Sequence, residues 1–259
     1  MNDINQSDLK DVLLRLKLPY TAAHISDFIA QATSRRLSVH EVVAEMCRLE
    51  STHQQHCRIE RRLKEAKIGR FKPMADFDWT WPRALDKEAV QSAMGLAFLS
   101  EKANLILVGP QGIGKTMIVR NIAHEAVLAG HSVIYTTASA LVVTLASQES
   151  SRQLERRLAS YTRTDLLVID EIGYLAFDAR AADLLFAVVD RRYENGPIVL
   201  TTNLAFGDWS TIFPGAACVT AMIDRLTHHA QIIAIDADSY RHRESKERQQ
   251  KKPEDTKRK

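Results

Sequence analysis

The stretch GPQGIGKT, residues 109–116, decides how the rest of the chain is interpreted. It follows the apolar run NLILV at 104–108 and precedes a helical pattern that begins at Lys115. Its glycines allow the backbone to curl so that N–H groups point inward, and the N-terminus of the following helix adds partial positive charge there. The order of strand, glycine-rich loop and helix therefore predicts a phosphate-binding loop. The alternative is a glycine-rich turn followed by a coincidental Lys-Thr pair, and such a turn would not have to lie between a strand and a helix.

Two side chains of this motif have expected roles. Lys115 is expected to reach the β- and γ-phosphates of a nucleoside triphosphate, and the Thr116 hydroxyl is expected to ligate Mg²⁺. The residues expected to surround the phosphates are Gly109, Pro110, Gln111, Gly112, Ile113, Gly114, Lys115, Thr116 and Met117.

A second candidate segment is LLVIDE, residues 166–171, about fifty residues after the loop. Apolar residues carry this strand through a sheet, and two carboxylates follow at its carboxyl end, where ligands bind in doubly wound sheets. Asp170 is expected to hold Mg²⁺ directly or through water, and Glu171 is expected to orient and deprotonate the attacking water. Acidic residues at the end of an isolated strand can also cap the following turn. The functional interpretation of this motif therefore depends on the phosphate loop that precedes it.

Three further polar residues carry a weaker signal. Asn203 ends the apolar run 198–203 and could hydrogen-bond the γ-phosphate or the attacking water, or could only begin a turn. Arg225 and Arg241 could stabilise charge on the γ-phosphate, and an arginine from a neighbouring subunit would do so only on assembly. Both arginines could equally serve structure alone. On the residues themselves, these alternatives stay open.

Short apolar strands alternate with helical patterns from residue 86 onward. This alternation predicts an α/β fold, with a parallel sheet covered by helices on both faces. The expected strands are 104–108, 132–137, 165–170, 198–203 and 231–236, and the expected helices are 86–100, 115–129, 138–146, 151–161, 178–194 and 219–229.

The start of the chain is predicted to form a small all-α bundle. The first helix places apolar residues of 9–16 on one face, and Pro19 is expected to end or interrupt it. Further helices are expected at 26–32 and 38–47, the second with Ser38 and Glu41 as a capping box.

Basic charge is concentrated at the two ends of the chain. Residues 1–72 carry 13 Lys and Arg against 9 Asp and Glu, residues 73–240 carry 13 against 19, and residues 241–259 carry 9 against 4. Within the first block, residues 58–72 hold seven cations and two glutamates and predict an amphipathic basic helix. Such clusters are typical of proteins that bind phosphate backbones, although solvated basic faces are about as common.

An aromatic stretch separates the two patterns. Residues 69–82 contain two prolines and no helical period. Its aromatic residues could stack on nucleic-acid bases, but we favour the interpretation that they pin a linker onto the neighbouring domain. These residues are Phe71, Phe77, Trp79 and Trp81. The predicted organisation is a helical domain at 1–70, a linker at 71–85, a nucleotide-binding domain at 86–243 and a basic, disordered tail at 244–259.

Composition excludes several classes of protein. With 259 residues, 45% of them apolar and 26% charged, the chain is neither fibrous nor disordered throughout. No apolar run approaches the ~18 residues that cross a bilayer, and the N-terminus lacks a secretory signal pattern, so a cytoplasmic, reducing setting is expected. The spacing of Cys47, His53, His56 and Cys57 fits no zinc site, which favours a polar helix face.

Five segments in order resemble the IstB-type ATP-binding proteins of insertion sequences: GPQGIGKT, LLVIDEIGYL, LTTNLAF, DRLTHH and DSYRHR. These proteins are AAA+ ATPases that assist a partner transposase, and they are close kin of helicase loaders of the DnaC and DnaI type. The resemblance covers residues 71–243 well and the helical N-terminal part more loosely. LLVIDEIGYL followed by LTTNLAF is specific to this branch.

This resemblance implies ATP and Mg²⁺ as cofactors and a AAA+ P-loop fold. Lys115 and Thr116 match the Walker A pair, Asp170 and Glu171 match Walker B, and Asn203 matches the sensor I residue.

Two arginines also match the family's motifs. Arg225 matches the trans-acting arginine finger, and Arg241 matches the sensor II position. Gln111 and Ile113 replace a commoner Pro and Thr, both at variable positions. No helical lid domain is expected, because the chain ends soon after Arg241.

The resemblance leads to two hypotheses of different classes. The first is a DNA-associated ATPase that activates a transposase, with duplex DNA, the transposase and further copies of the chain as partners and no membrane. The second is a replicative helicase loader, whose N-terminal helices would grip a helicase. A nucleotide-dependent switch with negligible turnover is a third possibility, and Glu171 argues against it. The nucleotide motifs are shared by the first two, so only the N-terminal helices would distinguish them.

Overall fold

The computed structural model describes residues 6–174, 176–237 and 240. The chain forms two compact units, Met1–Arg61 and Arg62–Lys259. Within the described residues, no helix combines the length and apolar character needed to cross a membrane.

The first unit is helical, as predicted. It contains α1 (Gln6–Arg15), α2 (Pro19–Arg35) and most of α3 (Val39–Ala66). Leu13, Ala22 and Ile25 form its small buried core. Glu50 of α3 is almost fully buried, and it accepts hydrogen bonds from the backbone N–H and the hydroxyl of Thr21 at 2.8 and 2.9 Å. A satisfied polar contact therefore holds α2 against α3.

Two predictions for these helices need correction. Pro19 begins α2, where its missing N–H is not needed, and α1 already ends at Arg15. The predicted helix at 38–47 and the basic helix are one continuous element, α3, because no glycine or proline separates them. The capping box is confirmed: Glu41 accepts from the backbone N–H of Ser38 at 2.8 Å and from its hydroxyl at 2.6 Å.

The second unit is built on a six-stranded sheet with the order β1-β6-β2-β5-β4-β3. The five longer strands pair in parallel, which confirms the predicted fold class. An unpredicted edge strand, β1, pairs antiparallel with β6 and is too short to leave a periodic signal. The strands are β1 (Ala84–Leu85), β2 (Asn104–Val108), β3 (Val133–Thr137), β4 (Leu166–Ile172), β5 (Ile198–Thr202) and β6 (Ala230–Asp236).

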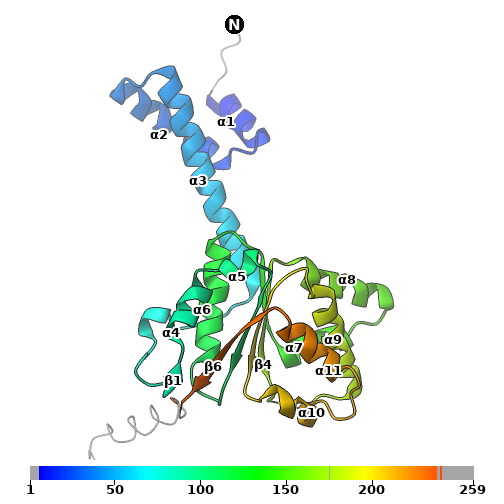
Figure 1. The fold of residues 1–259 in the computed structure, drawn as a ribbon. Helices are drawn as coiled ribbons and strands as arrows, with labels where there is room; N and C mark the ends of the chain where they lie inside the picture. The colour runs from blue at the N-terminus through cyan, green and yellow to red at the C-terminus, as the bar shows by residue number, and fades with distance from the viewer. Residues whose placement is uncertain (1–5, 175, 238–239, 241–259) are drawn as a thin grey trace, which may run out of the picture. The chain divides into compact units, whose positions relative to one another are not determined.

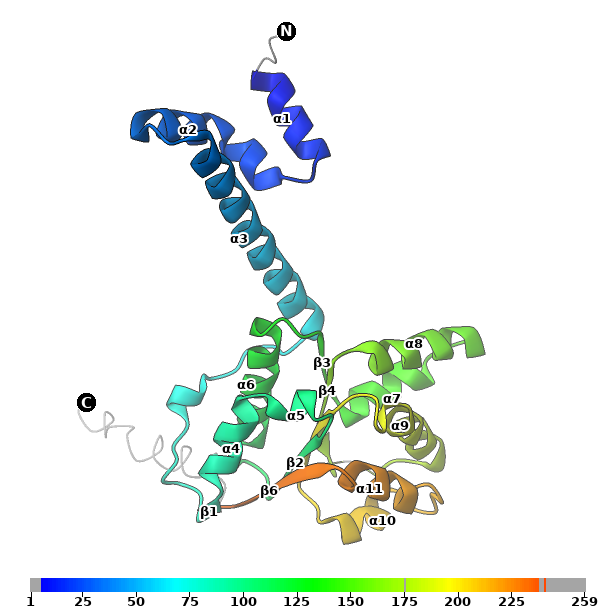
Figure 2. The same cartoon turned by 45° about the horizontal axis from the view of Figure 1, so that its top comes forward.

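Helices cover both faces of this sheet, with α4, α5 and α6 on one side and α7, α9 and α11 on the other (Figures 1 and 2). The helices are α4 (Lys87–Met94), α5 (Ala97–Ser100), α6 (Lys115–Leu128), α7 (Ala138–Ala146), α8 (Ser151–Arg163), α9 (Ala179–Arg192), α10 (Trp209–Ile212) and α11 (Val219–Thr227), with 3₁₀ turns η1 (Met74–Asp76) and η2 (Phe206–Asp208).

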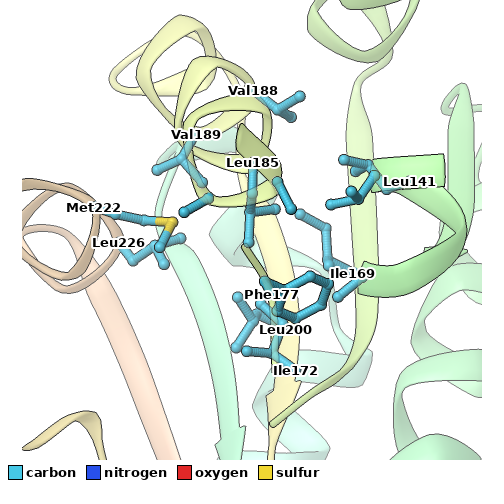
Figure 3. Close-up of a cluster of buried hydrophobic side chains, with 14 of the residues drawn as sticks. Leu141, Ile169, Ile172, Phe177, Leu185, Val188, Val189, Leu200, Met222 and Leu226 are labelled. Atoms are coloured by element: carbon cyan, nitrogen blue, oxygen red, sulfur yellow. The ribbon is translucent and has the colours of Figure 1, made fainter. Parts of the chain in front are cut away.

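The alternation of side chains along each strand builds two separate cores. Leu107 of β2 is buried on the side of α4 and α6, whereas its neighbour Ile106 is buried on the opposite side. Figure 3 shows that opposite core, where Ile169 of β4 and Leu200 of β5 lie under Leu185 of α9. The central strands β2, β4 and β5 are buried on both faces, which explains why they are mostly apolar, whereas Ile232 of β6 is exposed.

Several details of this unit differ from the sequence prediction. The helix expected at 86–100 is divided into α4 and α5, because Gly95 ends the first and Leu96 has a left-handed φ of +64°. β4 continues two residues beyond Asp170, its expected last residue. The four-residue helix α10 was not predicted, since one turn carries no periodicity.

Arg192, at the end of α9, is a buried brace between α8, β4 and β5. Its side chain is 1% exposed, and burial lowers its pKa to about 10. The guanidinium donates to the carbonyl oxygens of Tyr161, Thr162, Thr164, Asp165 and Pro197 at 2.7–3.4 Å. It thereby satisfies carbonyls at the carboxyl end of α8 that the helix itself leaves unpaired.

Replacing Arg192 by Met should destabilise the protein by about 3 kcal/mol or more, because several buried carbonyls would lose their donor. Arg191→Met is the matched control. Arg191 pairs with exposed Glu155 at 2.9 Å, and its loss should cost much less. Chemical denaturation measures both free energies of unfolding. Equal losses for the two variants would contradict a bracing role for Arg192.

Candidate nucleotide-binding site

The predicted phosphate loop connects β2 with α6, and close packing fixes its path. A Cβ on Gly109 would lie 2.2 Å from the carbonyl oxygen of Ile235, so the backbone of β6 leaves room only for glycine. Gly114 has a φ of +102° at the start of α6, and a Cβ there would lie 2.8 Å from the ring of Phe77. Both glycines are therefore required by close approach as well as by backbone conformation.

Lys115 lies beside this loop at the first position of α6. Its Nζ atom donates to the carbonyl oxygens of Gly109 at 2.5 Å and Pro110 at 2.6 Å, and the residue is 6% exposed. A buried ammonium needs acceptors of this kind. Phosphate oxygens in the loop would offer it stronger, charge-assisted acceptors a short movement away.

Asp170 lies on β4 next to the loop and is almost fully buried. Its Oδ1 atom is 3.4 Å from the Thr116 hydroxyl and accepts a hydrogen bond from Thr201 of β5. Its Oδ2 atom accepts one from the hydroxyl of Tyr135 on β3. The structure therefore brings together the two residues that the sequence analysis proposed as magnesium ligands.

Glu171 adopts a strained backbone beside this carboxylate. Its φ is +66°, unusual for a residue other than glycine, and the pairing of β4 with β5 shifts register between Ile169 and Ile172. The backbone N–H of Glu171 donates to the Thr201 hydroxyl at 2.9 Å. This bulge directs the Glu171 side chain into the lining of a pocket over the loop, and such strain is common at functional sites.

The pocket over the loop has a volume of about 280 Å³. The loop and Glu171 form one side, and the aromatic segment Phe71, Phe77 and Trp81 forms another. Tyr240 closes it through a backbone hydrogen bond to the carbonyl of Gly112 at 3.0 Å. The aromatics also pack against the buried core of this unit, which confirms the interpretation that they pin the linker.

The chemistry of the pocket suits a magnesium nucleotide. Main-chain N–H groups and the Lys115 ammonium are donors for phosphate oxygens. The Thr116 hydroxyl and the Asp170 carboxylate supply the oxygen ligands that a small hard cation prefers. Phe71 and Trp81 supply flat apolar surface for a base.

The remaining candidates occupy different positions. Asn203 follows β5, and its buried Oδ1 atom accepts no hydrogen bond from the described residues. Arg225 lies on α11, where it pairs with Asp190 at 3.1 Å and its guanidinium stands 4.7 Å from the ring centroid of Phe186. It does not belong to the lining of the loop pocket. Arg241 and the basic tail lie outside the described residues.

Sequence reasoning missed two hydroxyls that hold Asp170. Thr201 belongs to the LTTN run that the sequence does single out, although the pairing of that run with LLVIDE could not be predicted. Tyr135 has no such signal, since a single tyrosine in a strand has no diagnostic spacing. The order of strands, which brings both residues to Asp170, is not written in one sequence.

This sheet, loop and acidic pair define a P-loop nucleotide-binding protein of the AAA+ type. The family described as IstB-like ATP binding protein matches residues 12–248, and the chain belongs to this family. The resemblance noted from the sequence is thereby confirmed.

Relatives at moderate identity span nearly the whole chain. An ATP-binding protein of insertion sequence IS21 from Pseudomonas aeruginosa is 34% identical over 239 residues, covering 92% of this chain and 90% of that protein. Its counterpart in IS5376 from Geobacillus stearothermophilus is 35% identical over 237 residues, covering 92% and 94%.

Solved structures share the fold at lower identity. DnaI aligns with a TM-score of 0.51 at 21% identity, covering 65% of this chain and 93% of DnaI. The replication initiator DnaA bound to AMPPCP and single-stranded DNA aligns with a TM-score of 0.50 at 21% identity, covering 63% and 49%. These likenesses concern the AAA+ fold.

Replacing Lys115 by Met should weaken ATP binding about 10- to 100-fold, because charge-assisted hydrogen bonds are worth roughly 1.5–3 kcal/mol each. Equilibrium titration with a fluorescent ATP analogue measures this change. Lys102→Met, which removes an exposed cation outside the pocket lining, is the control and should bind normally. A folded Lys115→Met protein with wild-type affinity would refute the assignment.

Proposed function

We propose that this protein is an ATP-hydrolysing regulator that assembles on duplex DNA and activates a partner transposase during transposition of an insertion sequence. The observation that carries the proposal is that Lys115, Thr116 and Glu171 line one pocket while Asp170 contacts Thr116. Membership of the IstB-like family and the naming of its relatives as insertion-sequence proteins support the biological setting.

Hydrolysis is assigned to the chain's own groups as follows. Lys115 and the loop N–H groups bind the β- and γ-phosphates. Glu171 accepts a proton from a water molecule as that water attacks the γ-phosphorus, and the bond to the β-phosphate oxygen breaks to release ADP. Mg²⁺ held by Thr116 and Asp170 would neutralise phosphate charge. Asn203 orients the water or the γ-phosphate.

The position of Arg225 supports a site shared between copies of the chain. Within its own unit it pairs with Asp190 and does not line the loop pocket. A guanidinium on this surface reaches a γ-phosphate when it belongs to a neighbouring copy, which couples assembly to hydrolysis. Arg241 is assigned to the chain's own γ-phosphate by its family motif alone.

Glu171→Gln and Arg225→Ala should each keep ATP binding and lose at least about 100-fold in hydrolysis rate, the usual scale for a general base or arginine finger. Mixing the two variants should restore measurable phosphate release, because one kind of interface then contains an intact Glu171 and an intact Arg225. Each variant alone at the same total concentration is the control. A mixture as inactive as its components would contradict the shared site.

DNA contact is assigned to the basic part of α3. Arg58 and Lys64 are exposed there. Their double replacement by Gln should weaken binding to duplexes of any sequence and lower the slope of log affinity against log salt by about two, one per lost phosphate contact. Fluorescence anisotropy at several salt concentrations measures the slope. The control replaces Lys102 and Arg180, two exposed cations outside α3, and an equal change there would contradict the assignment.

A further inference from the structure

The two oxygens of Asp170 have different partners. Oδ1 faces Thr116, the other proposed magnesium ligand, at 3.4 Å. Oδ2 accepts a hydrogen bond from the hydroxyl of Tyr135, which is 6% exposed on the neighbouring strand β3. Tyr135 therefore holds the carboxylate from the side opposite Thr116. Because a carboxylate is planar, fixing Oδ2 also fixes the direction in which Oδ1 points.

Tyr135 is itself held by Arg120 of α6. The Nε atom of Arg120 donates to the Tyr135 hydroxyl oxygen at 3.1 Å, and the guanidinium carbon lies 5.1 Å from the ring centroid. The tyrosine hydroxyl can accept from Arg120 and donate to Asp170 at the same time. The hydrogen bonds thus run in one direction, from Arg120 to Tyr135 to Asp170. A charged donor at the start strengthens the second bond.

Arg120 has a second partner on the other side. Its terminal N–H donates to the carbonyl oxygen of Arg70 at 2.8 Å. The next residue, Asn121, bonds the carbonyl of Lys72 at 2.9 Å and the N–H of Met74 at 3.1 Å. These two residues of α6 hold the segment 70–74, which supplies Phe71 and Lys72 to the pocket wall. Arg120 therefore contacts both the support of Asp170 and the wall of the nucleotide pocket.

We propose that Tyr135 and Arg120 are positioning residues for divalent-cation binding, with Arg120 also holding the pocket wall for the nucleotide. The inference rests on the proposed ATPase function. Tyr135 is not part of the pocket lining, whereas Arg120 lines the pocket as well as contacting Tyr135. Mg²⁺ tolerates little departure from octahedral geometry, so the orientation of Asp170 Oδ1 should affect its affinity strongly. Loss of an outer partner of a metal ligand typically costs 10–100-fold in metal affinity.

The test measures Mg²⁺ binding without turnover. A fluorescent ATP analogue is bound to Glu171→Gln protein, and Mg²⁺ is then titrated from zero. Tyr135→Phe should raise the Mg²⁺ concentration at half-saturation about 10-fold or more, while affinity for the analogue in EDTA changes less than twofold. Tyr161→Phe, at another buried tyrosine, is the matched control and should leave both values unchanged.

Arg120 variants supply the second part of the test. Arg120→Met should raise both the Mg²⁺ half-saturation and the dissociation constant in EDTA, because it loosens Tyr135 and the wall and also removes a side chain that lines the pocket. In Tyr135→Phe protein, Arg120→Met should add less than twofold to the Mg²⁺ effect, since the connection is already broken. Arg120→Lys keeps the charge on a half-buried helix position and tests the inference if Tyr135→Phe unfolds, which a thermal melt detects.

The outcomes separate the inference from the proposed function. Unchanged Mg²⁺ half-saturation in folded Tyr135→Phe protein, or fully additive effects of the two substitutions, would overturn the inference and leave the ATPase proposal intact. Glu171→Gln protein in which Mg²⁺ has no effect on nucleotide binding would overturn both.

Discussion

The buried carboxylate of Asp170 constrains the elements that form the candidate site of the second unit. A carboxylate removed from water costs several kcal/mol unless hydrogen bonds replace its hydration. Here the donors come from three elements: Thr116 on α6, Tyr135 on β3 and Thr201 on β5. Satisfying this one group therefore places β3, β5 and the start of α6 around β4. The phosphate loop, which precedes α6, is held in register by the same requirement.

The local features of this site could be predicted because their signals are local. The loop motif is contained in residues 109–116, and each apolar strand can be recognised from a run of five to seven residues. The Thr116–Asp170 contact also follows, because both motifs lie at the carboxyl ends of parallel strands. The ends of helices are harder to predict, because a single residue can set them. Leu96, in a left-handed conformation, divides a helix that the apolar pattern predicts as continuous.

Contacts that depend on strand order were out of reach. β3 lies beside β4, and this adjacency lets Tyr135 approach Asp170 across 35 residues of sequence. Nothing in the composition of a five-residue strand records its neighbour. The same holds for β1, whose two residues pair with the carboxyl end of β6. The brace at Arg192 was invisible for a similar reason, because its carbonyl partners belong to backbone, which carries no residue signature.

The aromatic segment shows how a linker becomes part of a site. Phe77 packs against Gly114 so closely that a Cβ there would lie 2.8 Å from its ring, which adds a packing reason for glycine to the positive φ of this position. Phe71 and Trp81 line the same pocket from the neighbouring positions. Because Arg120 and Asn121 fasten this segment to α6, the helix that begins at the phosphate end of the site also fixes the wall expected to meet the base.

The contacts of Arg225 bear on its proposed role at the site of a neighbouring copy. Its guanidinium is paired with Asp190 and stacked over Phe186, so it is held in a defined position on α9 and α11. Ordering a long side chain when two copies assemble costs entropy. An arginine that acts on a neighbouring copy therefore benefits from being held in place beforehand, whereas one that acts on its own pocket would not need these contacts. The Asp190 partner therefore supports a preorganised trans contact. Its carboxylate also gives the partly buried guanidinium a counter-charge at 3.1 Å, while the Nη1 atom has no hydrogen-bond partner among the described residues.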